Sequence, residues 1–430
     1  MRVRYGGLLI VSLAGILTLS LTRGQERPAP PPPSTLPRPE PATLPAAPAP
    51  LPALDPAKLD GVTRQFFLSA RRGGEWLSRM NGVNGLFLNG WVPSLNVPLE
   101  GDDFLRQGGA AFALARVARL TGDERYAACA TRAVLTLLDH ADVFDPATQV
   151  RHTRLPSVVQ NRLGSAAMLV LAVNELPAPP ADLLEKSEQL CNFIRRQARP
   201  DGSLSSGDLL PDGRFSGEEA DAVNYYPGAA LYALARSTRH RPADWKLALV
   251  RNALAYYLPW WREHKNLAFV SWQSAAYADA CLQTRDRAFA DAVFEMADWL
   301  VALQYDLANN HQHPDWVGGF KSWSGGRAVD SPPTATSAAC GEALAVACRV
   351  SQLAGDDKRL SGYHEALLGC LQFVAALQYT ESNTTHFAPG YRDRLAGGFH
   401  ASAQDGTLRI DYTQHAVSAM ALFVEVTVPR

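Results

Sequence analysis

The chain repeats one sequence pattern six times, and this repeat restricts its fold more than any other feature. In each copy, a helix rich in small apolar residues is followed by a short turn and an amphipathic helix. The clearest copy starts at Gly108, turns at 120–123 and continues in a second helix from Glu124. The other copies start near Leu163, Pro227, Ser274, Cys340 and Ala416. Self-similarity at a spacing of roughly 45 to 75 residues predicts an array of helical hairpins.

Helical periodicity continues through almost the whole chain after position 56, and no convincing alternating strand interrupts it. We predict twelve helices of two kinds. Six are rich in Ala, Gly and Ser and apolar on most sides, as expected for helices that are buried all round. The other six carry Lys, Arg and Glu on one side. In chain order, the predicted helices cover residues 57–80, 104–121, 124–139, 161–174, 181–198, 224–239, 243–260, 270–282, 286–304, 334–354, 359–378 and 411–427.

The connections between these helices alternate in length. A small-residue helix leads to its amphipathic partner through a tight turn, in which Gly122 or Gly355 ends one helix and the following aspartate caps the next. An amphipathic helix leads to the next small-residue helix through a long loop. Six inner and six outer helices connected in this way predict an all-α (α/α)6 toroid, closed by 57–80 as the outer partner of the last inner helix. An open solenoid of the same hairpins is the alternative.

The first 56 residues do not fit this fold. Arg2 and Arg4 precede an apolar run at Gly6–Leu21, so we predict a signal peptide or an uncleaved signal anchor at 1–25. Residues 26–56 hold 13 of the chain's 30 prolines and should form an extended linker without a core. The toroid domain then covers 57–430. We predict an exported protein of the periplasm, the cell envelope or the extracellular space.

The composition excludes some partners. Positive and negative side chains nearly cancel, at a formal net charge of -1, so nothing indicates binding to nucleic acid. We find no P-loop, dinucleotide fingerprint, nucleophile elbow or zincin motif, and we predict neither a cofactor nor a metal. The six cysteines each lie in an Ala-rich helix, so we interpret them as core thiols with one disulfide at most. We expect a monomer, and membrane attachment through the N-terminal segment stays open.

Three long loops begin with a glutamine at the end of an outer helix and then reach a glycine. These are Gln197 before Gly202, Gln304 before Gly319-Phe320, and Gln378 before Gly398-Phe399. The pattern resembles a loosened form of the aromatic-x(3)-Gln…Gly-x-Trp repeat of squalene-hopene cyclases, in the terpenoid cyclase and prenyltransferase α/α-toroid superfamily. In that family the glutamine caps a helix, so the resemblance implies a structural role for it.

The chemistry of that superfamily is not implied. The Asp-x-Asp-Asp signature of the cyclases and the zinc-ligand spacing of the prenyltransferases are absent from the sequence. The domain at 57–430 also resembles the toroids of N-acylglucosamine epimerases, uronate epimerases and polysaccharide lyases. These resemblances support the fold and leave the reaction open.

The toroid geometry predicts where a site should lie. All inner helices start from the long-loop side, so their N-termini and positive dipole ends meet at one mouth and favour an anionic ligand. Aligned on their small residues, these helices carry a mostly polar ring: Gln107, Arg162, Tyr226, Gln273, Ala339 and His415. Further polar or aromatic residues lie about one turn earlier, among them Arg106, Tyr225, Trp272 and Asp411. Helix capping and satisfied core contacts are the alternative explanation.

The densest polar segment is 217–228. A carboxylate such as Glu219 or Asp221 could have a raised pKa there and serve as general acid or base beside Tyr226. Proton abstraction next to a uronate carboxyl also needs a cation that stabilises the enolate, and three arginines could supply it: Arg106, Arg162 and Arg409. The same carboxylates could instead only solvate a helix start.

Histidines form two further candidates. His311 and His313 have a spacing that metal ligands can use, but this signal alone is weak. We favour substrate contact, with Trp316 stacking on a sugar face. In the last inner helix, Asp411 and His415 are an i,i+4 pair, so the carboxylate could orient the imidazole as a base. A helix cap beside a buried histidine explains that pair equally well.

Together these features predict an exported toroid that acts on an acidic poly- or oligosaccharide as a lyase, epimerase or hydrolase. A terpenoid-cyclase-like enzyme and a non-catalytic glycan-binding or scaffold toroid are the alternatives. The predicted catalytic residues are Glu219, Asp221, Tyr226, Asp411 and His415. The predicted substrate-binding residues are Arg106, Gln107, Arg162, Tyr225, Trp272, Gln273, His311, His313, Trp316 and Arg409.

Overall fold

A computed structural model of the chain describes residues 53–101, 103–141, 143–153, 161–207, 221–308 and 312–428. The chain divides into two units, Met1–Leu44 and Pro45–Arg430, and every described helix and strand belongs to the second. The predicted signal segment and most of the predicted linker lie outside the described residues. Within the described residues, no helix combines the length and the apolar character needed to cross a membrane.

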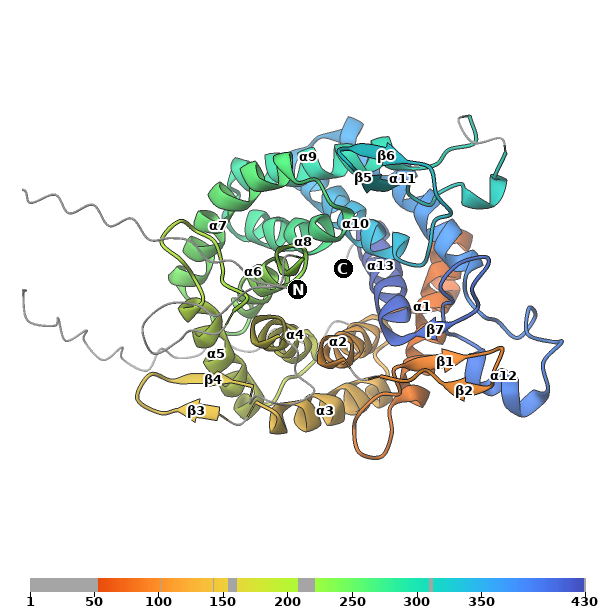
Figure 1. Ribbon diagram of the computed structural model, residues 1–430, viewed down its shortest axis with the longest axis horizontal. Coiled ribbons are helices and arrows are strands. Elements are labelled where there is room, and N and C mark those ends of the chain that lie inside the picture. Colours follow the sequence, from red (N-terminus) through yellow and green to blue (C-terminus); the bar gives the residue numbers. More distant parts are fainter. Residues whose placement is uncertain are drawn as a thin grey trace, which may run out of the picture. The chain divides into compact units, whose positions relative to one another are not determined.

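The inner helices form a closed ring (Figure 1). Each of them packs against the next one in the chain, and the last packs against the first. The predicted (α/α)6 toroid is therefore confirmed, and the open solenoid is wrong. The inner helices are α2 (Phe104–Thr121), α4 (Arg162–Glu175), α6 (Tyr226–Ser237), α8 (Leu267–Thr284), α10 (Ser337–Ala354) and α13 (Ile410–Thr427).

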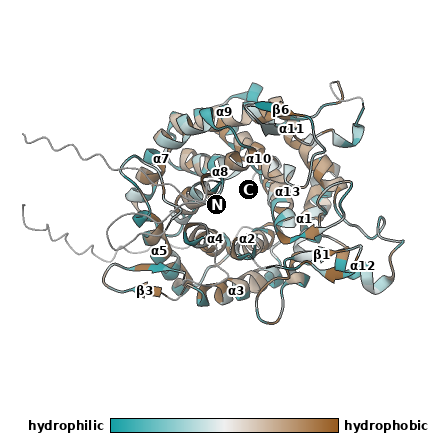
Figure 2. Ribbon diagram, in the orientation of Figure 1, coloured by the Kyte–Doolittle hydropathy of each residue, from teal (hydrophilic) through white to brown (hydrophobic). Residues whose placement is uncertain are grey.

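The outer helices surround this ring, and α1 packs against α13 as predicted. All twelve predicted helices are present, with ends within four residues of the predicted ones. Figure 2 shows hydrophobic residues along the helices of both rings and hydrophilic stretches on the outer helices and loops. The outer helices are α1 (Gly61–Met80), α3 (Glu124–Asp139), α5 (Ala181–Arg196), α7 (Asp244–Glu263), α9 (Arg287–Leu303) and α11 (Asp357–Ala376).

Small residues allow the inner helices to approach one another closely. A methyl group placed on Gly164 of α4 would lie 2.7 Å from the ring of Tyr226, and one on Gly228 of α6 would lie 2.8 Å from Cβ of Trp272. Both distances are shorter than carbon atoms tolerate without contact strain. The Ala- and Gly-rich character of these helices is therefore a packing requirement of the ring.

The tight turns have the predicted chemistry. Gly122 ends α2 and Gly355 ends α10, both in the left-handed conformation, with φ of 71° and 66°. The side chains of Asp123 and Asp356 then accept hydrogen bonds from backbone N–H groups in the first turn of the following helix. A glycine end and an aspartate cap satisfy groups that a helix terminus leaves unpaired.

The long loops hold short strands that the sequence did not predict. Each strand has two or three residues, too few to show the alternation that marks a strand. The strands form one antiparallel three-stranded sheet in the order β2-β1-β7 and the hairpins β3–β4 and β5–β6. Their bounds are β1 (Gly90–Val92), β2 (Val97–Pro98), β3 (Val143–Asp145), β4 (Val150–His152), β5 (Ser322–Ser324), β6 (Arg327–Val329) and β7 (Leu408–Arg409).

Four short helical segments complete the described secondary structure: the 3-10 helices η1 (Pro56–Lys58), η2 (Ala222–Asn224) and η3 (Pro314–Trp316), and the helix α12 (Pro389–Leu395).

The loop glutamines hold the long loops against the outer helices. Nε2 of Gln304 donates to the carbonyl oxygen of Gly318 at 2.9 Å, and Nε2 of Gln378 donates to that of Gly397 at 3.0 Å. Gln197 likewise donates to two carbonyl oxygens of its own loop. The structural role that the resemblance implies for these glutamines is thus confirmed.

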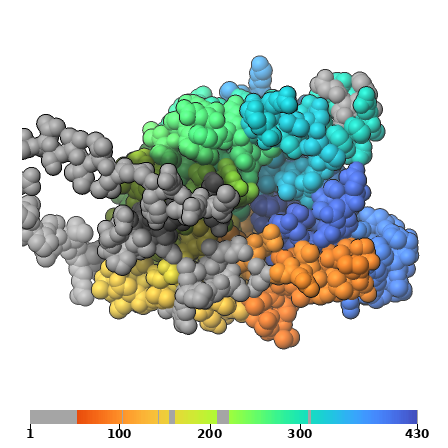
Figure 3. All heavy atoms as spheres, viewed as in Figure 1, coloured from red at the N-terminus to blue at the C-terminus, as the bar shows by residue number. Residues whose placement is uncertain are grey.

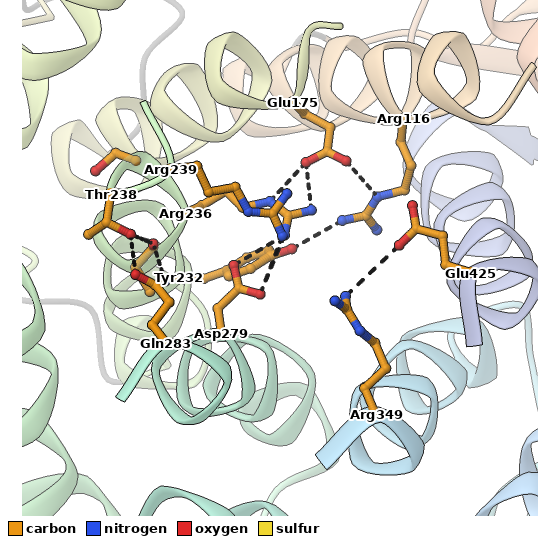
Figure 4. A network of polar contacts seen from close by, with 12 residues as sticks. Arg116, Glu175, Tyr232, Arg236, Thr238, Arg239, Asp279, Gln283, Arg349 and Glu425 are labelled. Carbon is orange, nitrogen blue, oxygen red and sulfur yellow. Dashed lines mark hydrogen bonds and ion pairs between the residues drawn. The ribbon is translucent and has the colours of Figure 1, made fainter. Parts of the chain in front are cut away.

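A cluster of buried charges lies between the inner helices near their C-terminal ends (Figure 4). Arg116, Glu175, Arg236 and Asp279 are each at most 6% exposed, and we call these four residues the ionic core. Arg236 contacts Glu175 at 2.7 Å and Asp279 at 3.1 Å. Burial alone would raise the pKa of Glu175, but the surrounding arginines, Arg236 first, hold it far below its ordinary value. No pattern in the sequence predicts this cluster.

All six cysteines are free and buried, as predicted. Their desolvation disfavours the thiolate; it raises the pKa of Cys191 to about 12. These thiols therefore serve as small core residues.

Candidate functional site

A pocket of about 440 Å³ opens among the starts of three inner helices. The residues that line it come from the segments 266–272 at the start of α8, 332–340 at the start of α10 and 409–415 at the start of α13, together with Tyr225 and 320–322. We call it the mouth pocket. Figure 3 shows a hollow in this face, bordered by α13, the loop before α10 and the β1–β2 region. The pocket lies at the end of the ring where the sequence predicts a site.

At the floor of the mouth pocket, His415 is paired with a glutamate that does not itself line the pocket. Nδ1 of His415 on α13 lies 2.7 Å from Oε2 of Glu342 on α10, and the two side chains are only 20% and 9% exposed. Burial disfavours the imidazolium, but the attraction and the hydrogen bond of Glu342 outweigh it. The pKa of His415 is therefore raised above its ordinary value of 6.5.

Asp411 has a different role from the one that the i,i+4 spacing suggests. Its carboxylate is bound by the guanidinium of Arg409, with Nε at 2.9 Å from Oδ1, and Nε of Arg106 lies 3.6 Å from Oδ2. The carboxylate that contacts His415 is Glu342, from the neighbouring inner helix. Asp411 therefore pairs with two arginines, of which Arg409 lines the mouth pocket and Arg106 does not.

Aromatic rings form part of the pocket wall. Trp272 is 9% exposed, and its ring lies edge-on to that of His415, with centroids 5.8 Å apart. Tyr225 is 46% exposed, and Tyr412 lies beneath the guanidinium of Arg409 at 4.3 Å. Flat apolar faces beside a few polar groups are typical of pockets that bind small organic ligands.

Two predicted ligand-binding glutamines do not line the mouth pocket. Gln107 is 3% exposed, and its amide both donates to the backbone oxygen of Phe87 and accepts from its N–H, at 2.8 and 2.7 Å. This pairing holds the loop after α1. Gln273 is fully buried where α8 packs on Gly228 of α6. We therefore leave both residues out of the site.

Tyr226, Arg162 and Asp221 also lie apart from the pocket wall. The ring of Tyr226 packs over Gly164, and Arg162 is the first residue of α4. Asp221 is exposed at the start of η2 and caps no backbone group. Glu219, the other predicted acid–base carboxylate, lies outside the described residues. Of the described residues of this segment, 221–228, only Tyr225 lines the mouth pocket.

The predicted histidine loop forms an aromatic stack. The rings of His313 and Trp316 lie 3.9 Å apart, and Trp316 packs in turn against Tyr305, at 5.4 Å. Neither His313 nor Trp316 lines the mouth pocket, whereas Phe320 in the same loop does. His311 lies outside the described residues. Among those that are described, no cluster of three or more His, Cys, Asp or Glu side chains could hold a metal ion.

The residue that the sequence analysis missed is Glu342. It is a carboxylate in the second turn of α10, where the neighbouring residues from Ser337 to Ala347 are otherwise small or apolar. A charge inside a helix that is buried on all sides needs a partner, and this mismatch was the available signal. The identity of the partner depends on which inner helix lies next to α10.

The comparisons with known proteins agree with this architecture. No protein-family model matches the sequence, and no curated protein matches it either. Among solved structures, a D-mannose isomerase has a TM-score of 0.61 at 11% identity, with 86% of this chain and 100% of that chain covered. An unsaturated glucuronyl hydrolase specific for heparin has a TM-score of 0.59 at 13% identity, with 84% and 98% covered. A cellobiose 2-epimerase from Bacillus thermoamylovorans has a TM-score of 0.58 at 13% identity, with 84% and 99% covered.

The chain has the fold of the α/α-toroid sugar-processing enzymes. At 11% to 13% identity, this likeness shows the fold of the toroid and no more. The isomerase, hydrolase and epimerase catalyse different reactions on one architecture, so the function of this toroid has to be argued from its own mouth pocket.

Proposed function

We propose that this protein is an enzyme that processes a saccharide in the mouth pocket, with His415 as its acid–base group and Glu342 as the partner of that histidine. The observation that carries the proposal is the contact of 2.7 Å between His415, at the floor of an open pocket, and Glu342 behind it. A carboxylate bound to one ring nitrogen fixes the tautomer and orientation of a histidine and stabilises its charged form. The shared fold of sugar-processing enzymes supports the substrate class.

Proton transfer at a sugar carbon is the chemistry that this pair suits best. Nδ1 of His415 faces Glu342, so Nε2 is the nitrogen that would take a proton from the substrate or return it. Hydrolysis of a glycosidic bond usually needs a pair of carboxyl groups, one on each side of the bond. The carboxylate in the described pocket wall, Asp411, is bound to Arg409, so a lyase, epimerase or isomerase reaction is favoured over hydrolysis.

The finer proposal is that the substrate is an acidic poly- or oligosaccharide. The N-termini of α8, α10 and α13 meet at the pocket, and their dipoles favour a negative group. Arg409 and Lys321 line the wall, but each is paired with an aspartate, so the net charge of the pocket contributes little. Export of the protein is part of the proposal and is based on the sequence pattern at 1–25.

The test is a screen of the purified protein against neutral and uronate-containing oligosaccharides. Unsaturated products report a lyase, deuterium uptake from heavy water reports an epimerase or isomerase, and new reducing ends report a hydrolase. His415→Gln should lower the turnover of the active substrate by about 100-fold or more, as loss of a general acid–base group does. His364→Gln, on outer helix α11 and away from the pocket, is the matched control.

The pH dependence gives a second readout. A base must be deprotonated to act, so activity should rise with pH through the raised pKa of His415. Glu342→Gln removes the attraction that holds the proton, so the midpoint of this rise should move to lower pH. Saccharide binding without turnover, unchanged by His415→Gln, would contradict the enzymatic proposal and leave a glycan-binding module.

A further inference from the structure

Glu342 has a second charged neighbour on the side away from His415. Its Oε2 contacts His415, whereas its Oε1 lies 3.8 Å from Nη1 of Arg116 on α2. One oxygen of this carboxylate thus faces the histidine, and the other faces the arginine. Both Glu342 and Arg116 are buried, with side chains 9% and 2% exposed, so little water screens this contact.

Arg116 is held in place from several sides. Its Nη2 donates to the hydroxyl of Tyr232 at 3.1 Å, and its Nε lies 3.6 Å from Glu175 in the ionic core. The guanidinium also lies over the ring of Phe112, 4.4 Å from its centre. Arg116 therefore cannot turn away from Glu342 without breaking contacts with three other residues.

The space between the pocket floor and the ionic core is small. A cavity of about 10 Å³ lies there, and Arg116, Tyr232, Ser271, Trp272 and Glu342 are among the residues that line it. This volume accommodates about one water molecule. A charge on Arg116 therefore acts on Glu342 and His415 through a weakly polarisable interior, where charge interactions are strong.

We propose that Arg116 is a positioning residue of the mouth pocket, which holds the Glu342 carboxylate in contact with His415 and balances its charge when the histidine gives up its proton. The inference depends on the proposed role of His415 as acid–base group. Without Arg116, loss of that proton would leave an unbalanced negative charge on a buried pair, which is costly. When Arg116 is present, its positive charge balances this negative charge. Arg116 should therefore lower the pH at which His415 becomes a free base.

Other charged groups near His415 do not replace this effect. On α13 itself, Asp411 favours the protonated histidine, and on α10 so does Glu342. From α8, the residue in ring contact is Trp272, which carries no charge. The charge of Arg116 opposes the protonation of His415, whereas Arg409 and Arg106 are paired with Asp411.

The experiment is an NMR titration of His415 in the substrate-free full-length protein, with isotope-labelled histidine. The His415→Gln variant identifies the signal. Arg116→Met should move the titration midpoint of His415 upward by about one pH unit, the order of shift that a unit charge at this range produces. Arg116→Lys keeps the charge and should restore most of the wild-type midpoint. Glu342→Gln should move the midpoint in the opposite direction.

Arg349→Met is the matched control, because Arg349 is also an arginine of an inner helix and pairs with Glu425, at 3.9 Å. The titration midpoint of His415 in this control variant should equal that in the wild-type protein. If Arg116→Met does not fold, Tyr232→Phe removes one support of the guanidinium and should give a smaller upward shift. An unchanged or lowered midpoint in Arg116→Met, or in Tyr232→Phe if that variant has to replace it, would overturn the proposal.

The titration and the saccharide screen can each refute their own proposal without refuting the other. The titration needs no substrate, so a shifted midpoint with no active saccharide would refute the proposed function and leave the control of His415 by Arg116 intact. An active enzyme whose pH profile and His415 midpoint ignore Arg116→Met would refute only the role of Arg116.

Discussion

Replacement of Glu175 by glutamine is the sharpest test of the ionic core. The carboxylate of Glu175 is fully buried and contacts Arg236 at 2.7 Å, Arg119 at 3.3 Å and Arg116 at 3.6 Å. Glu175→Gln keeps the size and shape of the side chain and removes its charge. The three arginines then share fewer carboxylates, and an amide N–H group would face at least one guanidinium.

The expected loss follows from the competition between attraction and desolvation. Two unit charges about 4 Å apart attract by about 4 kcal/mol at an effective dielectric constant of about 20, and Glu175 has three such partners. Desolvation of the buried ions cancels several kcal/mol of this gain. Loss of one partner from a buried ion pair costs about 3–5 kcal/mol, and we expect Glu175→Gln to lie in this range. Since whole domains are stable by only about 5–15 kcal/mol, the variant should still fold but with a small margin.

The assay is urea unfolding of the purified protein, followed by far-ultraviolet circular dichroism, with the free energy taken from midpoint and slope. Glu295→Gln is the control, since Glu295 pairs with Arg262 at 2.6 Å on the surface, where both side chains are more than one third exposed. Exposed pairs contribute about 0–1 kcal/mol. A loss of less than about 1 kcal/mol for Glu175→Gln, equal to the control, would show that water screens the cluster and that the reasoning is wrong.

Three further predictions concern stability. In the folded protein the pKa of Glu175 is far below its ordinary value of 4.5, so the unfolded chain binds more protons in acid. The free energy of unfolding should therefore fall as the pH drops below about 4.5. Urea titrations at several pH values should show a smaller fall for Glu175→Gln. Gln378→Ala removes hydrogen bonds to Ser69 and Gly397 and should cost about 2–4 kcal/mol, measured by the same unfolding assay; a near-neutral result would contradict the role of the loop glutamines. Gly362→Ala, at an exposed position of α11 with free space around the added methyl group, should stabilise the protein by about 0.5–1 kcal/mol, and a lower melting temperature would refute this.

The ring of helices was predictable because its signals are local. Apolar periodicity, small-residue content and capping residues such as Gly122 and Asp123 act within one or two turns of a helix. Closure was also predictable, because the number of hairpins and the alternation of short turns and long loops leave few arrangements. The strands of the long loops were not, because pairs such as β1 and β7 join segments more than 300 residues apart.

Only part of the candidate site was predictable. Alignment of the inner helices brought Trp272, Asp411 and His415 to one mouth, where they line the pocket. It did so because residues near the starts of the inner helices all lie at the same end of the ring. It also selected Gln107, which instead binds the backbone at Phe87. Position along a helix can be read from sequence, but the side of the helix that faces the pocket depends on its rotation against its neighbours.

The sequence by itself determined six hairpins, favoured a closed ring and indicated the end of that ring at which a pocket would open. The tertiary structure alone decided that the partner of His415 is Glu342 and that Arg116 lies beneath it. These three residues come from three inner helices, and charge pairing acts through space between side chains that are distant in the chain. No local pattern could choose among the buried charges, because five of the six inner helices each carry one: Arg116, Glu175, Arg236, Asp279 and Glu342.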